Sequence, residues 1–133
     1  MSKKVLIVED DESFYSLCET AIKLKGYQVV HVADGSQAIQ KIITEKPDLL
    51  LLDIVLPGMS GLDILENIKA MEEIKNTRVI MLTNFGTDAN VNKAMELGAE
   101  DYVMKYNVVP AELANKVEVL LGDSSDSAVK IVG

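Results

Sequence analysis

The stretch Asp48-Leu49-Leu50-Leu51-Leu52-Asp53 decides the fold, and Ile54-Val55-Leu56-Pro57-Gly58 follows it directly. Four consecutive leucines between turn-forming residues are typical of a strand that is buried on both faces of a parallel sheet. A carboxylate at the carboxyl end of such a strand costs free energy unless another group pairs with it. Because ligands of open α/β sheets bind at that end, Asp53 is a candidate for chemistry.

Strands and helices are predicted to alternate on both sides of this stretch. Short apolar runs predict further strands at residues 5–8, 28–33, 78–83 and 101–104. Helical spacing of apolar residues predicts helices that begin near Ser13, Ser36, Ser60, Asp88 and Pro110, with Ser36 and Ser60 as N-caps. We therefore predict an α/β fold: a five-stranded parallel sheet, doubly wound as (βα)5, in the flavodoxin-like strand order 2-1-3-4-5.

Length and composition predict one folded domain. The chain has 133 residues, of which 48% are apolar. We expect the domain to cover residues 1–121 and the polar residues 122–133 to form a flexible C-terminal tail. The single cysteine, Cys18, lies in a helical apolar pattern and is expected in the core of a cytoplasmic protein.

The charge balance excludes two classes of partner. Thirteen basic and 21 acidic residues give a net charge of −8, which argues against direct binding to nucleic acid or to an anionic membrane. No apolar stretch approaches the roughly 20 residues that span a bilayer. An acidic chain is compatible with a cluster of carboxylates that holds a divalent cation.

Such a cluster is predicted where the first strand ends, at Glu9-Asp10-Asp11. In the predicted strand order the first and third strands are neighbours, so Glu9 and Asp10 converge with Asp53. Carboxylates at close range repel one another, and Mg²⁺, which prefers oxygen ligands, relieves this repulsion. The acids can instead cap the following helix, where negative charge is favourable. Asp11 fits that alternative best, whereas the convergence favours a metal site for Glu9 and Asp10.

Two further strand ends contribute polar groups to the same edge of the sheet. Thr83 ends the fourth predicted strand and Lys105 follows the fifth. Alone, each is unremarkable, since threonine ends many strands and lysine is usually a solvated charge. Beside three acids, the ammonium can bind a phosphoryl group and the hydroxyl can donate to one of its oxygens. The set predicts a site for an anionic group on or near Asp53, with Mg²⁺ neutralising charge.

At these residues the chain resembles a receiver domain of bacterial two-component response regulators. The resemblance covers about residues 3–121 and rests on Glu9-Asp10, residues 53–61, Thr83 and Lys105, in the family's order and spacing. It implies that Asp53 is the phosphoacceptor and takes the phosphoryl group from a phosphohistidine of a sensor histidine kinase or phosphotransfer protein.

The resemblance also implies a role for each site residue. The implied Mg²⁺ ligands are Asp10, Asp53, Glu9 through a water and Val55 through its backbone carbonyl. Thr83 and Lys105 would bind phosphoryl oxygens, and Thr83 with Tyr102 on the fifth strand would form the conformational switch. A downstream target protein would bind to the face made by the fourth helix, the fifth strand and the fifth helix.

Some positions depart from the family's usual pattern. Tyr106 replaces the proline that usually follows the lysine, where the bond is often cis. A cis bond before a non-proline residue costs about 2.5–4 kcal/mol, so a trans bond and a strained cis bond are both open. Asn84 stands where alanine or glycine is usual and narrows access to the phosphoryl site. Val55 and Phe85 occupy positions that influence water access, and neither side chain can position a water. We therefore predict a phosphoryl-Asp53 that outlives the one in a Val55→Asn, Phe85→Glu variant.

Three classes of function compete. The leading hypothesis is a stand-alone response-regulator receiver, since no output region fits in residues 122–133. The alternative is that the chain is a receiver fragment of a larger regulator. The second class is a phosphorylation-independent receiver-like binding module. The third is an enzyme, such as an aspartyl-phosphate phosphatase or a flavin protein. It is weak because Val55 replaces the second aspartate of those phosphatases and His31, the only histidine, is expected at the surface of an edge strand. We expect no activity beyond self-phosphorylation and dephosphorylation.

Overall fold

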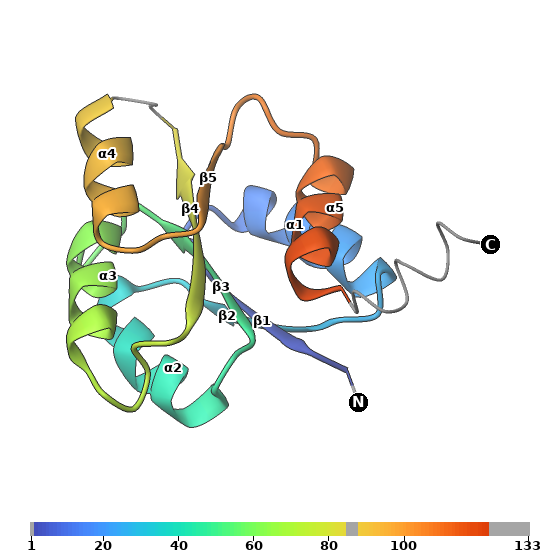
Figure 1. Ribbon diagram of the computed structural model, residues 1–133. Helices are drawn as coiled ribbons and strands as arrows, with labels where there is room; N and C mark the ends of the chain where they lie inside the picture. Colours follow the sequence, from blue (N-terminus) through green and yellow to red (C-terminus); the bar gives the residue numbers. More distant parts are fainter. Residues whose placement is uncertain (1, 85–87, 123–133) are drawn as a thin grey trace.

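The structure is a computed structural model that describes residues 2–84 and 88–122. Its elements alternate along the chain as predicted (Figure 1). They are β1 (Lys4–Val8), α1 (Glu12–Leu24), β2 (Gln28–Val32), the 3-10 helix η1 (Gly35–Gln37), α2 (Ala38–Glu45), β3 (Leu49–Asp53), α3 (Gly61–Ala70), β4 (Arg78–Thr83), α4 (Asp88–Glu96), β5 (Asp101–Met104) and α5 (Pro110–Leu121).

The five strands form one parallel sheet in the order β2-β1-β3-β4-β5, which confirms the predicted topology. The register sets Val8 of β1 between Val32 and Leu52, and it pairs Asp53 with Leu82 of β4. Because all strands run in the same direction, their carboxyl ends meet at one edge of the sheet. That edge is where Asp53 lies.

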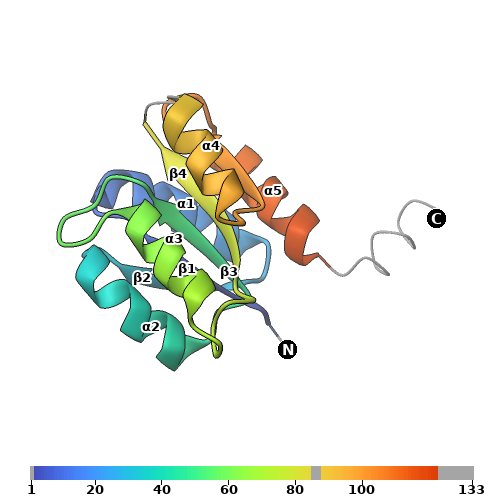
Figure 2. The same ribbon diagram turned by 60° about the vertical axis from the view of Figure 1, so that its left-hand side comes forward.

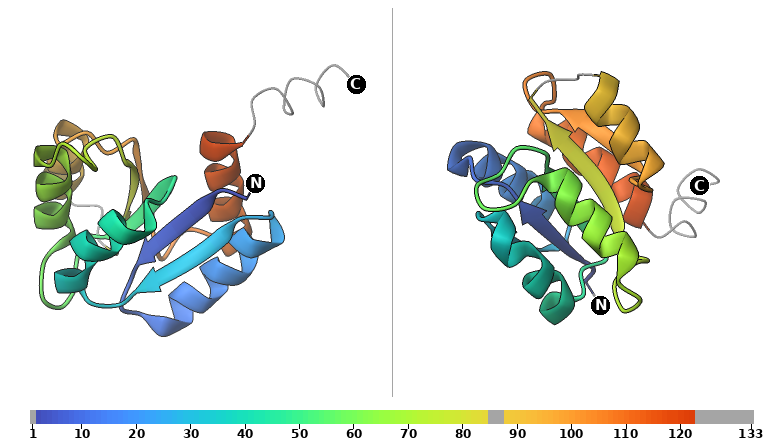
Figure 3. Two further views of the ribbon diagram at one scale, coloured as in Figure 1. Left: turned by 90° about the horizontal axis from the view of Figure 1, so that it is seen from below. Right: turned by 90° about the vertical axis from the view of Figure 1, so that its left-hand side faces the viewer.

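Alternating strand residues divide the core into two layers, one on each face of the sheet. Leu50 and Leu52 of β3 pack in the layer covered by α2, α3 and α4, whereas Leu49 and Leu51 pack in the layer covered by α1 and α5. Figure 2 and the right view of Figure 3 show α2, α3 and α4 together on the near side of the sheet. β3 is buried along its whole length, which explains its unbroken run of leucines.

Helix starts test the cap predictions. Ser60 caps α3 as predicted, because its hydroxyl accepts the N–H of Asp63 at 3.2 Å. The prediction for Ser36 is wrong, because α2 has Gln37 at its N-cap position, without a side-chain cap hydrogen bond. Asp34 caps the preceding turn η1: its carboxylate accepts from the Ser36 N–H at 2.8 Å and from the Ser36 hydroxyl at 2.7 Å. The turn η1 precedes α2, and the Gly35 N–H at its start donates to the carbonyl of Pro57 at 2.9 Å.

Some expectations concern parts of the chain that the structure does not describe. Phe85 and residues 123–133 lie outside the described residues, so the predicted tail and domain boundary stay predictions. Across residues 2–84 and 88–122, every helix is too short or too polar to span a bilayer.

Candidate functional site

The predicted site residues lie together at the carboxyl edge of the sheet. Glu9 follows β1, Asp53 is the last residue of β3, Thr83 is the last residue of β4, and Lys105 follows β5. Carboxylate oxygens of Glu9, Asp10 and Asp53 all lie within 4.8 Å of one another. Glu9 and Asp53 are buried, whereas Asp10 is exposed.

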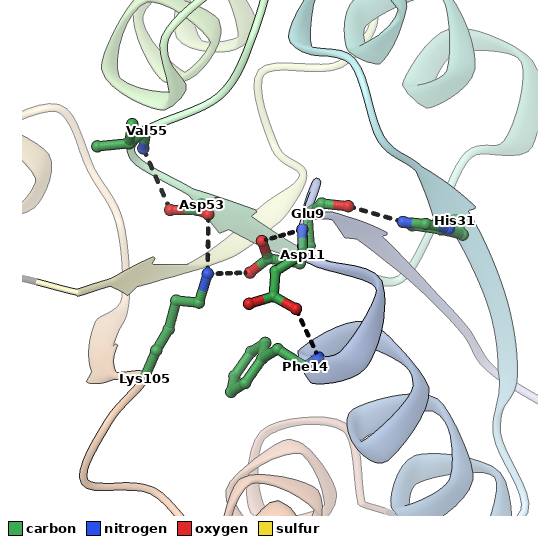
Figure 4. A network of polar contacts seen from close by, with 7 residues as sticks. All are labelled: Glu9, Asp11, Phe14, His31, Asp53, Val55 and Lys105. Atoms are coloured by element: carbon green, nitrogen blue, oxygen red, sulfur yellow. Dashed lines mark hydrogen bonds and ion pairs between the residues drawn. The ribbon is translucent and has the colours of Figure 1, made fainter.

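Lys105 points into this cluster of acids (Figure 4). Its Nζ lies 2.6 Å from Oε1 of Glu9 and 3.1 Å from Oδ2 of Asp53. The ammonium also lies 5.0 Å from the ring centroid of Phe14, and the side chain is only 6% exposed. Burial lowers the pKa of Lys105, but the two carboxylates outweigh it and the net direction is upward. Lys105 therefore stays charged between the two acids.

Burial makes the charged form of Glu9 unfavourable. Its Oε2 accepts the N–H of Asp11 at 2.9 Å. Its Oε1 forms an ion pair with the Lys105 ammonium but receives no well-aligned hydrogen bond from the described residues. Burial raises the pKa of Glu9 to about 7, against the lowering effect of Lys105 and the Asp11 N–H, with the charge of Asp53 also raising it.

These residues fit a hard divalent cation. The donor set consists of carboxylate oxygens, which suit Mg²⁺, and one buried oxygen of Glu9 has no aligned donor among residues 2–84 and 88–122. One ammonium neutralises part of the charge of three neighbouring acids, so a cation still has an electrostatic reason to bind. Asp11, by contrast, accepts the N–H of Phe14 at 3.0 Å and caps α1, which confirms the capping interpretation.

The loop after β3 holds the Asp53 carboxylate from the other side. The Val55 N–H donates to Oδ1 of Asp53 at 3.1 Å, and Val55 itself is 65% exposed. The Gly61 N–H donates to the carbonyl of Ile54 at 2.8 Å, and a β-carbon on Gly61 would overlap the backbone oxygen of Asp53. Helix α3 therefore starts against the very end of β3 and fixes the loop between them.

The residues predicted to bind phosphoryl or to switch lie on β4 and β5. Thr83 is buried, and its carbonyl accepts the N–H of Lys105 at 2.8 Å. Tyr102 is 39% exposed on β5, and Tyr106 is exposed as well. The peptide bond between Lys105 and Tyr106 is trans, as all bonds between described residues are. Asn84, next to Thr83, is exposed.

Sequence reasoning missed two neighbours of the cluster. Phe14 lies beside the Lys105 ammonium. His31 was expected at the surface, but it is half-buried: its ring stacks on Tyr15 at 3.6 Å between centroids, and Nε2 lies 2.7 Å from the Glu9 carbonyl oxygen. β2 is an edge strand, but its two faces are still covered by helices. His31 lies on the face that α1 covers. In the sequence, only the aromatic residue Tyr15 in α1 could have indicated that the His31 ring is covered.

Comparison with known proteins identifies the family. The family model of the response regulator receiver domain matches residues 5–118. Sporulation initiation phosphotransferase F of Bacillus subtilis is 38% identical over 79% of this chain and 83% of its own length. The alkaline phosphatase synthesis transcriptional regulatory protein PhoP of Bacillus subtilis is 34% identical over 96% of this chain and 52% of its own length.

A solved structure agrees with this assignment. The BeF3-activated N-terminal receiver domain of RstA from Klebsiella pneumoniae superposes with a TM-score of 0.81 at 31% identity, covering 91% of this chain and 100% of that one. The chain spans about half the length of the first curated relatives, which are transcriptional regulators and DNA-binding response regulators. From its fold and its sequence, this chain belongs to the receiver domain family of two-component response regulators.

Proposed function

We propose that this receiver domain is a Mg²⁺-dependent phosphorylation switch with Asp53 as the phosphoacceptor. The observation that carries the proposal is the gathering of acids and one ammonium around Asp53. Carboxylate oxygens of Glu9, Asp10 and Asp53 lie within 4.8 Å, and Lys105 Nζ lies 3.1 Å from Asp53 Oδ2. A phosphoryl group can approach a carboxylate only where positive charge offsets the repulsion, and this site supplies it.

The ligands proposed for Mg²⁺ are Asp10 and Asp53 directly, Glu9 through a water and Val55 through its backbone carbonyl. When bound, Mg²⁺ would neutralise charge on the phosphoryl oxygens during transfer. The chain orients the acids beforehand. The backbone N–H of Asp11 donates to the Glu9 carboxylate, and the backbone N–H of Val55 donates to the Asp53 carboxylate. Both carboxylates are therefore already oriented before a ligand binds.

The proposed reaction is an in-line displacement at phosphorus. A carboxylate oxygen of Asp53 attacks phosphorus and forms a P–O bond, while the P–N bond to the donor histidine breaks and its electron pair returns to the imidazole nitrogen. The ammonium of Lys105 lies beside Oδ2 of Asp53 and can follow charge onto the phosphoryl oxygens. The product is an acyl phosphate on Asp53.

The readout would pass through Thr83 and Tyr102. Thr83 lies at the end of β4 and would donate its hydroxyl to a phosphoryl oxygen. Tyr102 would then turn inward from its present 39% exposure. Such a movement biases an equilibrium between two conformations of the surface formed by α4, β5 and α5.

The proposed partners are a sensor histidine kinase or histidine phosphotransfer protein as phosphoryl donor and a downstream target protein on the α4–β5–α5 surface. A shallow pocket of about 220 Å³ lies on this surface. Its lining includes Tyr102, Met104, Asn107, Val108, Glu112 and Lys116. We predict that the domain acts as a stand-alone switch, with a part of a longer regulator as the alternative. We also predict that it works in the cytoplasm.

Intact mass spectrometry after incubation with Mg²⁺ and a small phosphodonor tests the proposal. We expect the mass to increase by one phosphoryl group in the wild-type protein and to stay unchanged in Asp53→Asn or after chelation of Mg²⁺. No increase in the wild-type protein would contradict the proposal and favour the phosphorylation-independent binding module. A pull-down with and without Mg²⁺ and beryllofluoride then identifies the proteins bound by the activated state.

A further inference from the structure

The imidazole of His31 lies outside the carboxylate cluster but contacts the backbone within it. His31 belongs to the edge strand β2, and its Nε2 lies 2.7 Å from the carbonyl oxygen of Glu9 (Figure 4). This carbonyl is part of the peptide unit that joins Glu9 to Asp10. Because a carbonyl oxygen can only accept a hydrogen bond, Nε2 must carry the hydrogen and donate it.

Helix α1 fixes the orientation of the imidazole. The ring stacks on Tyr15 with 3.6 Å between centroids and an interplanar angle of 10°. Tyr15 is itself held, because its hydroxyl donates to Glu19 at 2.7 Å and its N–H donates to the Asp11 carbonyl at 2.9 Å. The ring therefore cannot turn away from Glu9 without losing its contact with α1.

Strand β2 thus holds the backbone of Glu9 at two points. The Glu9 N–H donates to the carbonyl of Val32 at 3.0 Å, and the Glu9 carbonyl accepts from His31. The hydrogen bond to Val32 extends the ladder between β1 and β2 by one residue. The hydrogen bond from His31 holds the carbonyl of the same residue, Glu9, where the chain leaves the sheet.

We propose that His31 is a positioning residue for the Mg²⁺ site. By holding the Glu9 carbonyl, it fixes the peptide plane between Glu9 and Asp10 and so the directions in which both carboxylates leave the backbone. This inference rests on the proposed Mg²⁺ site. Groups that orient metal ligands without touching the metal commonly change metal affinity when they are replaced.

Two substitutions separate the hydrogen bond from the ring. His31→Phe keeps a ring that can stack on Tyr15 but has no donor, and His31→Gln supplies an N–H donor without the ring. In calorimetric titrations of the full chain with Mg²⁺, we expect His31→Phe to bind about ten-fold more weakly than wild type. We expect His31→Gln to remain within about two-fold, since it restores the donor. Gln28→Ala, at the exposed start of the same strand β2, is the control and should leave the affinity unchanged.

NMR of the metal-free protein provides a second readout. The Asp10 nitrogen shares a peptide bond with the Glu9 carbonyl, so its chemical shift should move in His31→Phe and return toward the wild-type value in His31→Gln. In the wild-type protein, nitrogen-15 spectra of the imidazole should show hydrogen on Nε2. If His31 contributed only to overall stability, His31→Phe would lower the melting temperature but would change neither the Mg²⁺ affinity nor the Asp10 chemical shift.

The outcomes distinguish this inference from the proposed function. A wild-type chain that does not bind Mg²⁺ overturns the metal site, and the role of His31 with it. If wild type binds and His31→Phe binds equally well, or if both His31 variants lose affinity equally, only the role of His31 is overturned. An Nε2 without hydrogen in the wild-type protein also overturns it, even if a variant does not fold.

Discussion

Nζ of Lys105 lies 3.1 Å from Oδ2 of Asp53, so the proposed phosphoacceptor is ion-paired before any phosphoryl group arrives. The same ammonium lies 2.6 Å from Glu9. Lys105 therefore has a structural role in addition to the role proposed for it in phosphoryl binding. Loss of Lys105 should affect both stability and reactivity, and the two effects can be measured separately.

Lys105→Met should lower the free energy of unfolding of the Mg²⁺-free protein by about 3 kcal/mol, because two buried carboxylates lose their partner. Mg²⁺ should restore part of this loss, since it offers the acids another positive charge. Urea unfolding with and without Mg²⁺ measures both effects. Lys116→Met is the matched control: Lys116 pairs with Asp101 at a partly exposed position, and its loss should cost less than about 1 kcal/mol. Equal losses in the two variants would contradict the prediction.

Cys18 should be unreactive in the folded protein. It is fully buried, and burial, with the charge of Glu9 as a second cause, raises its pKa from 9.0 to about 12. A thiol reagent should label it only as fast as the protein unfolds. Because the pKa is higher in the folded state, the contribution of the neutral thiol to stability is complete below about pH 9 and is lost as the pH rises toward 12. Cys18→Ala should therefore show a smaller loss of stability between these pH values, and rapid labelling of native protein would disprove the prediction.

Gly35→Ala should disturb the loop that follows Asp53. A β-carbon at residue 35 would overlap the backbone oxygen of Met59, and we expect a loss of about 2 kcal/mol in unfolding free energy. The amide resonance of Val55, which reports the hydrogen bond to Asp53, should shift. Gly26→Ala serves as control: Gly26 has a φ of +97° and open space around it, so alanine should cost about 1 kcal/mol without moving Val55. An unchanged Val55 resonance in Gly35→Ala would count against the loop contact.

Val55→Asn should shorten the lifetime of phosphoryl-Asp53. Val55 is 65% exposed, its backbone N–H contacts Asp53, and its apolar side chain cannot orient a water. An asparagine amide can do so, and we expect hydrolysis about ten-fold faster, less than a general base would supply. Decay of the phosphorylated mass with time measures the rate. Val55→Ala, which is smaller but equally unable to orient water, should leave the rate close to that of wild type; a similar acceleration in both variants would point to steric access instead.

Most of the fold could be predicted because the strands are local apolar runs. Residues 78–83 and 101–104 were predicted as strands with the bounds that β4 and β5 have, and the parallel topology follows from the alternation with helices. Topology alone then brings Glu9 and Asp53 to one edge, since neighbouring parallel strands end side by side. Neither the positions of the strands nor the convergence of their ends depends on specific side-chain contacts, so both can be predicted from the pattern of residue types.

Contacts between distant residues could not be predicted in the same way. Ser36 is a residue type that often caps helices, but here it lies inside the 3-10 turn η1, which Asp34 caps and which precedes α2. His31 is covered by Tyr15, and which side chain covers an edge strand depends on how α1 packs. The pairing of Lys105 with Glu9 likewise depends on rotamers, which a pattern of residue types does not specify.

The alternation of β3 and β4 places Asp53 and Thr83 on opposite faces of the sheet. Asp53 continues the row of Leu49 and Leu51 on the α1 and α5 side, whereas Thr83 continues the row of Met81 on the side of α4. In the proposed switch, phosphorylation therefore takes place on the face covered by α1 and α5, whereas the Thr83 that responds to it belongs to the face covered by α4. Because both residues are the last of their strands, their proposed coupling would run around the carboxyl edge of the sheet and not through either hydrophobic layer.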